Sequence, residues 1–495
     1  MAAVSGMRAW PVLGALAAVA SAACSDRGAT SAPSRALAIV SAAVSPDPFN
    51  TLSATVSYTA SGADSARLVY WSDTEPPRAT PYARSDDGPD RLVALGLAPH
   101  TAYQGSLEVR GAGGSLASTA VAFSSGDLPA ALQSVHLQLQ GVPPPGYLLT
   151  DVTAGADGDT SAYAVAFDPA GEIRWYRGFH ADPGEHALAC EQQPDGHFTL
   201  FVGASPGWLP VAGRYFEFTA EGESLAVYTA GAALYTDPHE LLLRDGGATG
   251  RVALLFGYDL RSENLVPLGG LASQLVAGHT ILRQTASGAV DFQWSAWDHF
   301  TLADWVARPP NLSQFSSIDF DHPNSIEVDG AGNYIVSFAS LTQIVKIDPA
   351  TGAMRWRFGG RENQFTLVGD ELGGFGIQHD VRLLPNGDLL LFDNGNYHVP
   401  PESRAAEYRL DTLAMTATLV WEYRHVPAVF APYVGSAERY RNGHTLVGFG
   451  AAGVMTEVAG DGTVAWEGRL AVGGQSPAAF YRVRELPSLY THESP

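Results

Sequence analysis

Cysteine, charge and long apolar runs are all scarce in this chain of 495 residues. Only 16% of the residues are charged, and the formal net charge is -22. A chain this acidic lacks the basic patch that nucleic acids and anionic membrane surfaces require, which argues against both as partners. Beyond residue 24 no apolar run is long enough to cross a bilayer. The sequence also lacks a convincing 3.6-residue apolar periodicity, which argues against amphipathic helices.

Turn-forming and hydrophobic residues are abundant instead. The chain contains 53 Gly and 32 Pro, and 46% of its residues are hydrophobic. This composition is typical of an all-β protein with many tight turns and an ample core. The length predicts more than one folding unit.

The first 24 residues have the features of an export signal. Arg8 precedes an apolar stretch at 12–23, which is too short to span a bilayer, and Ser21-Ala22-Ala23-Cys24 resembles a bacterial lipobox. We expect residues 1–24 to be a signal peptide and Cys24 to carry lipid, so that the protein contacts a membrane only through this anchor. Outer-membrane attachment, or a periplasmic or secreted protein after ordinary cleavage, are the expected locations in a bacterium. An uncleaved anchor is a third alternative.

Two segments follow the signal. Residues 25–36 are small and polar and predict a flexible tether. Lipidation of Cys24 would leave Cys190 alone, as a small buried residue without a disulfide. Residues 37–128 show short alternating strands, and the run from Leu97 to Tyr103 resembles the tyrosine corner of fibronectin type III domains. We therefore expect a fibronectin type III-like β-sandwich there.

A second periodicity extends from about residue 135 to 486. Strands that end in an aromatic residue recur every 45 to 66 residues, at Trp175, Tyr228, Trp294, Trp356, Trp421 and Trp466. Strand-built repeats of this length predict propeller blades, with these aromatic residues in the packing between them. Six blades are expected, or seven if residues 130–150 form a partial unit.

Four histidines occupy similar places in successive repeats. His186, His239, His322 and His379 each precede, by 7 to 10 residues, a glycine that closes a turn. In a propeller this placement brings His239, His322 and His379 together at the channel mouth, whereas His186 has a longer spacing and is out of phase. Imidazole titrates near neutral pH, so the cluster is a candidate for acid, base or nucleophile chemistry.

Several motifs in residues 290–425 carry a family resemblance. In order they are HPNS at 322–325, WRFGG at 356–360, QHD at 378–380 and LFDNG at 391–395. They resemble the bacterial arylsulfate sulfotransferase family over about residues 135–486. The resemblance implies transfer of a sulfuryl group from a phenolic sulfate donor to a phenolic acceptor. It implies a ping-pong reaction through a sulfated histidine, independent of PAPS and of any other cofactor.

The resemblance also assigns roles to residues. It places the nucleophile on His379, with His322 and His239 as supporting catalytic residues and no metal. Substrate-binding candidates are Asn324, Gln378 and Asp393, of which Asp393 has the alternative role of shaping a turn. Tyr397 and Phe338 are candidates for an aromatic acceptor pocket.

One position departs from the family pattern. Aligned on Ile344–Ile347, Ala339 stands where the family carries an arginine, so a fixed cation for the sulfuryl oxygens is missing. By strand alternation Arg382 should point away from the channel, and Arg404 has an ordinary counterpart in the family. The departure favours an alternative: a propeller lipoprotein that binds sulfated or phenolic ligands without turnover. The intact histidines favour transfer, or a hydrolase in which water attacks the sulfohistidine.

Overall fold

The computed structural model describes residues 36–85, 88–141, 143, 145–156, 159–204, 213–247 and 250–490. The predicted signal peptide with Cys24, and all of the predicted tether except Ala36, lie outside the described residues. The described chain is all-β, as predicted. Its only helical elements are 3-10 turns: η1 (Ala112–Gly114), η2 (Ala130–Ser134), η4 (Val266–Leu268), η5 (Ala296–Asp298), η6 (Leu312–Gln314) and η7 (Gly450–Ala452). None of its helices has the length and apolar character of a membrane span.

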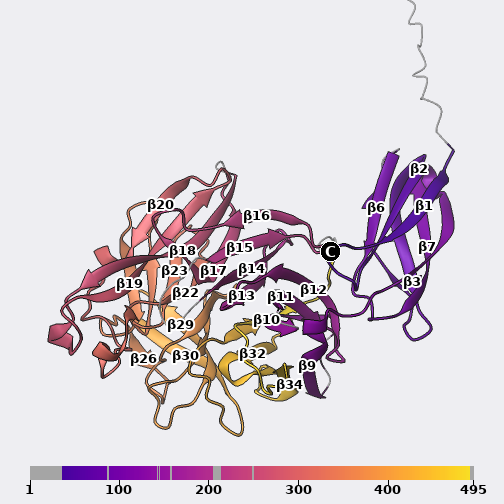
Figure 1. Cartoon of the computed structure of the whole chain (residues 1–495). Coiled ribbons are helices and arrows are strands. Elements are labelled where there is room, and N and C mark those ends of the chain that lie inside the picture. Colours follow the sequence, from indigo (N-terminus) through magenta and orange to yellow (C-terminus); the bar gives the residue numbers. More distant parts are fainter. Residues whose placement is uncertain are drawn as a thin grey trace, which may run out of the picture. The chain divides into compact units, whose positions relative to one another are not determined.

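The first strands form two sheets that enclose one core (Figure 1). One sheet has the order β1-β2-β6, and the other has the order β4-β3-β7-β8 with β5 beside β3. Their bounds are β1 (Ala38–Pro46), β2 (Ala54–Ser61), β3 (Ala63–Trp71), β4 (Arg78–Ala79), β5 (Ala83–Arg84), β6 (Gly88–Ala94), β7 (Ala102–Gly111) and β8 (Leu116–Ser124). Alternate residues of β2 and β7 are buried, as a half-exposed strand requires. The Tyr103 hydroxyl accepts a hydrogen bond of 2.8 Å from the backbone N–H of Ala98, five residues upstream.

Six further sheets follow, which we number I to VI. Sheet I contains β10 (Tyr147–Ala156), β11 (Asp159–Phe167), β12 (Ile173–His180) and β35 (Val483–Leu486). Sheet II contains β13 (Glu185–Gln192), β14 (Phe198–Ala204), β15 (Gly213–Phe218) and β16 (Ser224–Tyr228). Sheet III contains β17 (Tyr235–Asp245), β18 (Arg251–Glu263), β19 (Gln274–Thr285), β20 (Val290–Ser295) and β21 (Ser317–Asp319).

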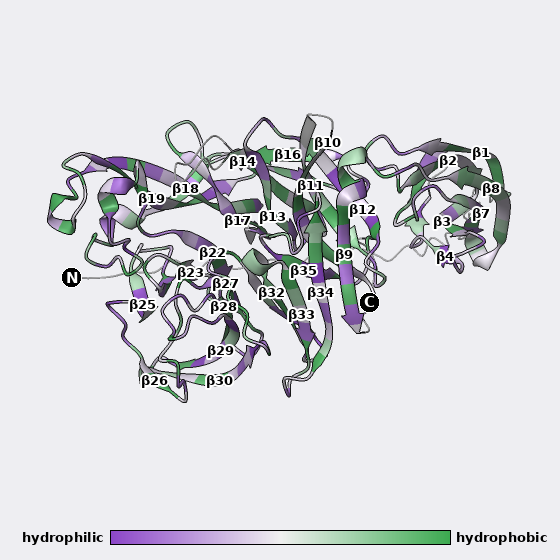
Figure 2. Ribbon diagram, turned by 60° about the horizontal axis from the view of Figure 1, so that its bottom comes forward, coloured by the Kyte–Doolittle hydropathy of each residue, from purple (hydrophilic) through white to green (hydrophobic). Residues whose placement is uncertain are grey.

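The remaining three sheets continue in chain order. Sheet IV contains β22 (Pro323–Val328), β23 (Tyr334–Phe338), β24 (Gln343–Ile347) and β25 (Met354–Gly359). Sheet V contains β26 (Thr366–Val368), β27 (His379–Leu383), β28 (Leu389–Asp393), β29 (Arg404–Asp411) and β30 (Thr416–Arg424). Sheet VI contains β31 (Ser436–Arg439), β32 (Thr445–Phe449), β33 (Val454–Val458), β34 (Val464–Val472) and β9 (Val135–Gly141). Figure 2 shows hydrophobic residues distributed along these strands.

The sheets contact one another in a closed cycle. Strand β10 contacts β13, and the contacts continue through β17, β22, β27 and β31, while β32 contacts β35 of sheet I. The two ends of this part of the chain join the cycle, because β35 pairs with β10 and β9 pairs with β34. Residues 130–150 therefore supply strands to sheets VI and I, and the described residues after Ser124 form no sheet beyond sheets I to VI.

The recurring tryptophans join neighbouring sheets. In three cases the indole N–H of an outer strand donates to a backbone carbonyl in a turn of the next sheet. The pairs are Trp175 to Ala220 (2.7 Å), Trp294 to Gly352 (2.9 Å) and Trp421 to Gly460 (3.1 Å). These residues therefore pack between sheets, as their recurrence predicted.

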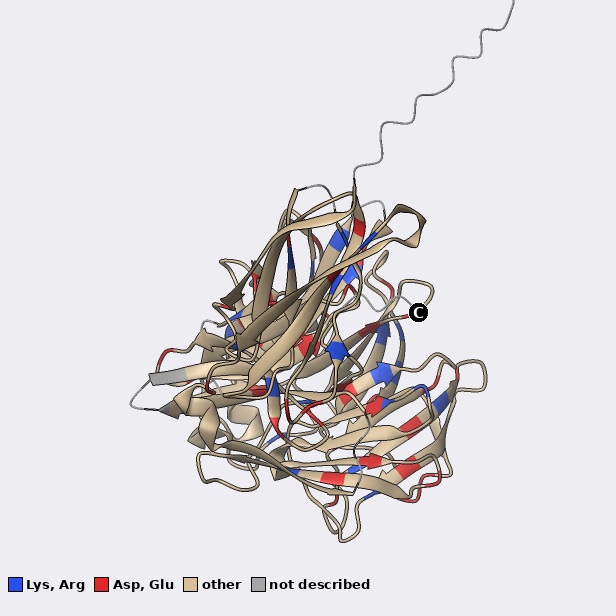
Figure 3. Cartoon of the chain, turned by 90° about the vertical axis from the view of Figure 1, so that its right-hand side faces the viewer, with Lys and Arg blue, Asp and Glu red and all other residues tan. Residues whose placement is uncertain are grey.

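Charged side chains of the innermost strands and of the segment that leads into β35 form an ion network. Figure 3 shows that acidic and basic positions also occur on other strands. Each of sheets I to VI contributes to this ion network, whose members are Glu191, Glu240, Glu327, Asp380, Arg382, Glu438, Arg482 and Arg484. Arg482, only 1% exposed, lies 3.1 Å from Glu240 and donates to the backbone carbonyl of Asn324. Removing one partner of a buried ion pair leaves an uncompensated charge and costs about 3–5 kcal/mol, so each member of this network depends on the others.

The side chain of Arg382 corrects a prediction from strand alternation. Its guanidinium points into the ion network, 3.0 Å from Glu240 and 3.2 Å from Glu327. The cause is a bulge in β27 between His379 and Arg382, which shifts the alternation by one residue.

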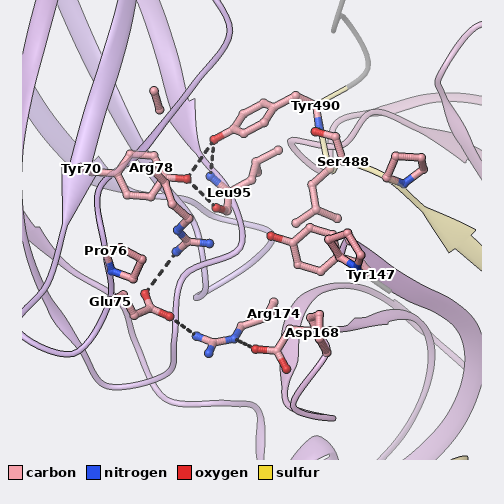
Figure 4. Close-up of a pocket in the computed structure, with 16 residues that line it drawn as sticks. Tyr70, Glu75, Pro76, Arg78, Leu95, Tyr147, Asp168, Arg174, Ser488 and Tyr490 are labelled. Atoms are coloured by element: carbon pink, nitrogen blue, oxygen red, sulfur yellow. Dashed lines mark hydrogen bonds and ion pairs between the residues drawn. The ribbon is translucent and has the colours of Figure 1, made fainter. Parts of the chain in front are cut away.

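The C-terminal segment returns to the first two sheets, within the compact unit that begins at Leu37. The Tyr490 hydroxyl accepts from the Leu95 N–H and lies 3.3 Å from the Tyr70 hydroxyl (Figure 4). These residues line the pocket that Figure 4 shows, together with Glu75, Asp168 and Arg174. Glu75 accepts from Arg174, which also pairs with Asp168, so these charges are already matched.

Candidate functional site

A pocket of about 260 Å³ lies at the start of β22 and β27. Apolar and aromatic side chains supply most of its wall, and two of the predicted histidines supply its polar side. Its lining residues are Trp305, Ala307, Pro309, Phe315, Ser317, Ile318, Asp319, His322, Ala339, Ser340, Ile377, His379, Asn396, Pro432 and Tyr433. Such a concave, largely apolar cavity with a few convergent polar groups is typical of a small-molecule site.

The innermost strands are irregular where they carry the histidines. Pairing shifts register between Thr236 and Leu241 in β17, at the start of β22, and between His379 and Arg382 in β27. His322 and Ile377 also have positive φ values of 49° and 56°. Bulges redirect side chains, and strained non-glycine residues of this kind concentrate at functional sites. The distortion therefore aims the histidines at the pocket.

The three predicted catalytic histidines converge. The ring centres of His239 and His322 are 4.3 Å apart, and those of His322 and His379 are 6.1 Å apart. His322 and His379 line the pocket directly, and His239 stands behind His322. His186 is exposed on β13.

The ring of His379 is held in one tautomer. Its Nδ1 lies 2.8 Å from Oδ1 of Asn394 and 2.9 Å from the carbonyl of Ile377. The Asn394 amide is oriented by its own Nδ2, which donates to the carbonyls of Ala431 and Val434. Both partners of Nδ1 are acceptors, so Nδ1 carries the proton and Nε2 carries the lone pair. Burial, with repulsion from His322, lowers the pKa of His379 to about 3.

His322 has the opposite electrostatic character. Its Nδ1 lies 2.7 Å from Oδ2 of Asp319. Burial opposes the charged ring, but the Asp319 carboxylate outweighs it and raises the pKa of His322. The pocket therefore favours the charged form of His322 next to a neutral His379.

His239 also pairs with a carboxylate but remains less basic. Its Nδ1 lies 3.0 Å from both oxygens of Asp237. Burial lowers the pKa of His239 by more than the Asp237 carboxylate raises it. The hydroxyl of Tyr481 donates to the His239 backbone carbonyl and fixes the strand from below.

Sequence reasoning missed a fourth histidine. His279 lies in β19, 1% exposed, with Nδ1 2.6 Å from Oδ1 of Asp321 and Nε2 3.3 Å from Oδ2 of Asp237. It falls outside the repeat pattern. The available signal was a single ionisable residue within the apolar run LVAGHTIL, because a buried histidine needs a charged partner. Asp237 and Asp319 were missed too, although they precede His239 and His322 by only two and three residues.

The three predicted substrate-binding residues lie outside the pocket wall. Asn324 is fully buried and donates to the Gln378 carbonyl, directly before His379. The Gln378 amide donates to the Ser337 hydroxyl inside sheet IV. Asp393 accepts from the N–H of Gly376 and from Arg404. It therefore holds the loop that precedes His379 in place. These side chains hold the backbone around His379 in place.

The aromatic wall also differs from expectation. Phe338 packs in the hydrophobic core of sheets III and IV, and Tyr397 covers Gly376 outside the pocket. Trp305, Phe315 and Tyr433 supply the aromatic surface instead. They come from long connections whose folding no repeat pattern predicts.

The pocket has an alanine where the family has arginine. Ala339 lines the pocket, and the described lining includes no arginine or lysine. Arg382 belongs to the ion network, and Arg404 is fully buried against Asp370 and Asp393. Among the lining residues of the pocket, His322 is therefore the candidate for a positive charge, because its pKa is raised.

Two groups of side chains in the described residues are spaced as metal ligands would be. In the first, Asp195, His197 and Glu217, the Arg251 guanidinium already contacts both carboxylates. In the second, His279, Asp319 and Asp321, a contact of 2.6 Å between ring and carboxylate is a hydrogen bond. In both groups the carboxylates therefore already contact protein cations or ring nitrogens.

The sequence model of the arylsulfotransferase (ASST) family matches residues 136–471. This match covers more than half of the chain, and the protein belongs to that family. A search of curated proteins gave no match.

Solved structures give only distant likenesses. A protein of unknown function from Bacteroides caccae is 13% identical, with 69% of this chain and 98% of that chain covered and a TM-score of 0.40. Selenomethionine-substituted virginiamycin B lyase from Staphylococcus aureus is 11% identical, with 68% and 99% covered and a TM-score of 0.33.

Proposed function

We propose that the protein is a PAPS-independent aryl sulfotransferase that moves a sulfuryl group from a phenolic sulfate to a phenolic acceptor through His379. The observation that carries the proposal is the fixed tautomer of His379, whose Nδ1–H is held by Asn394 and Ile377. A neutral imidazole with its Nε2 lone pair available is a competent nucleophile. Membership of the arylsulfotransferase family supports the same chemistry.

The reaction is divided between two side chains, a neutral His379 and a cationic His322. Nε2 of His379 attacks sulfur, the bond from sulfur to the aryl oxygen breaks, and the phenolate takes a proton from His322. A phenolic acceptor then returns its proton to His322 and attacks sulfur, and the nitrogen–sulfur bond breaks. Sulfuryl transfer spreads negative charge over the sulfuryl oxygens, so a cationic His322 stabilises the transition state as well as donating its proton.

We also infer the architecture that supports this site. The closed cycle of sheets I to VI supports a six-bladed β-propeller at 135–486, sealed by β35 and β9. The two sheets between Ala38 and Ser124, with the Tyr103 to Ala98 bond, support a fibronectin type III-like sandwich.

One observation favours a second function. Ala339 leaves the pocket without the family's arginine, which favours a protein that binds sulfated or phenolic ligands without turnover. Losing such a group commonly costs on the order of 2–4 kcal/mol of transition-state stabilisation. Attack by water on the sulfohistidine, which would make the protein a hydrolase, is the remaining alternative.

Purified protein with p-nitrophenyl sulfate, with and without phenol, separates these functions. Release of p-nitrophenol that requires phenol supports transfer, and release without phenol indicates hydrolysis. Binding without release indicates the ligand-binding alternative. His379→Ala should abolish release, while the matched variant His186→Ala, an exposed histidine of β13, should leave it unchanged. Release by His379→Ala at the original rate would overturn the assignment of the nucleophile.

We further propose that the protein is exported by residues 1–24 and anchored by lipid on Cys24. The apolar stretch and the lipobox-like sequence support this proposal. Labelled palmitate should enter the original protein and not Cys24→Ser. Equal labelling of both would overturn it.

A further inference from the structure

His279 is enclosed by ionisable groups from several elements. Asp321 and Asp237 contact its two ring nitrogens, and Asp319 Oδ1 lies 3.9 Å from Nδ1. The ring of Tyr258, from β18, lies 4.4 Å away, centre to centre. His239 and His322 stand beyond these carboxylates, each bonded to one of them. No part of the described mechanism uses His279.

The contacts of His279 define its protonation. Both oxygens of Asp321 accept backbone N–H bonds, from His279 and from His322, so Asp321 is an acceptor and Nδ1 of His279 donates to it. Nε2 faces the Asp237 carboxylate at 3.3 Å. A bare lone pair there would be repelled by that carboxylate, whereas an N–H is attracted. The ring therefore carries both protons, and these carboxylates raise its pKa well above the ordinary value despite burial.

Asp237 lies close to two histidines, whereas Asp319 lies close to only one of its two histidine neighbours. Asp237 contacts His239 at 3.0 Å and His279 at 3.3 Å. Asp319 contacts His322 at 2.7 Å but stays 3.9 Å from His279. A charged His279 thus partly neutralises the Asp237 carboxylate, which would otherwise raise the pKa of His239 further. It leaves Asp319 freer to raise the pKa of His322.

We propose that His279 is a buried imidazolium and a positioning residue, which holds Asp237 and Asp321 in place and keeps His239 neutral beside a charged His322. The importance of this difference for catalysis rests on the proposed function. The charge on His279 does not, because it follows from contacts that exist without substrate.

Histidine-selective ¹⁵N NMR of the full-length protein tests the charge directly. We expect one histidine to keep both ring N–H groups at pH 8, and that signal to vanish in His279→Gln. In Asp321→Asn the same signal should lose a proton within the measured pH range. His444→Gln, which removes a histidine paired with Glu457 in sheet VI, is the matched control and should leave the signal unchanged. A neutral His279 ring at pH 8 would overturn the proposal, even if neither variant folds.

The coupling to the site has its own readout. Without the charge on His279, both His239 and His322 should titrate at higher pH, by about one unit. The alkaline limb of the transfer reaction should move upward with His322. A purely structural role would lower the rate and leave both titrations in place, which would contradict the proposal. One equivalent of zinc bound by the original protein and lost in His279→Gln would also contradict it, since a metal would then replace the proton. If the protein shows no transfer at all, the NMR experiment still tests the charge on His279, because that charge does not depend on turnover.

Discussion

Oδ1 of Asn394 lies 2.8 Å from Nδ1 of His379, while its Nδ2 is held by two backbone carbonyls. This amide therefore cannot reverse without losing three hydrogen bonds, and it fixes which nitrogen of a neutral His379 carries the lone pair. We predict that Asn394→Ala lowers kcat about 10–100-fold, the usual effect of removing a group that orients a reactive side chain. The burst of p-nitrophenol on mixing with donor measures it. Asn386→Ala, in a turn of the same sheet, is the control, and an unchanged burst in Asn394→Ala would refute the orienting role.

The pH dependence should follow His322. Its pKa is raised above 6.5, so the general acid is present below that raised value and is lost as the pH increases through it. His379, with a pKa of about 3, stays neutral over the same range and should add no limb near neutral pH. In Asp319→Asn the carboxylate that raises the pKa is gone, so the alkaline limb should move to lower pH. If the alkaline limb of the kcat/KM profile does not move in Asp319→Asn, the limb belongs to a group other than His322.

Restoring the cation at position 339 should increase the rate. We predict that Ala339→Arg raises kcat/KM by about 10-fold or more, since a guanidinium on the sulfuryl oxygens contributes on the order of 2–4 kcal/mol. Ala339→Gln, similar in length and uncharged, is the matched control. Because Ala339 is fully buried, circular dichroism should first establish that both variants fold. Equal rates for the two variants would show that His322 already supplies the required charge.

Tyr433 should contribute to aryl binding and little to stability. It lines the pocket and is 56% exposed, so truncation leaves the core intact. We predict that Tyr433→Ala raises KM for aryl sulfates about 2–10-fold, the effect of one lost aromatic contact, with little change in kcat. Tyr397→Ala removes a tyrosine of similar exposure outside the pocket and should leave KM unchanged. Equal effects of the two variants would exclude a specific contact.

The indole bonds between sheets should contribute to stability. Trp294→Phe keeps a ring in place but removes the donor to Gly352, which is left without its partner. We expect the free energy of unfolding to fall by about 1–3 kcal/mol, measured in urea. Trp421→Phe removes the corresponding bond at an exposed position and should cost less.

The sequence predicted those features that repeat. Strand alternation and the recurring tryptophans gave the all-β class and the packing between sheets. The repeated position of His239, His322 and His379 in the sequence predicted that the three side chains lie close together. Local sequence suffices here because each repeat folds in the same way.

What the sequence did not predict depends on contacts between repeats. His279 reaches Asp237 and Asp321 only because sheet III and the loop before sheet IV meet in space. The direction of Arg382 depends on one bulge, which a strict alternation of strand residues does not contain. Gln378 and Asp393 belong to the right segment, but their hydrogen bonds turn them into the interior.

The segment that leads into β35 holds the backbone near two of the histidines. The Tyr481 hydroxyl bonds to the His239 backbone, and Arg482 bonds to that of Asn324, across more than a hundred residues of sequence. During biosynthesis, therefore, the arrangement of the histidines stays incomplete until the ribosome has added Tyr481 and Arg482. An aborted chain that stops before Tyr481 would contain His239, His322 and His379 but would lack the two hydrogen bonds from this segment.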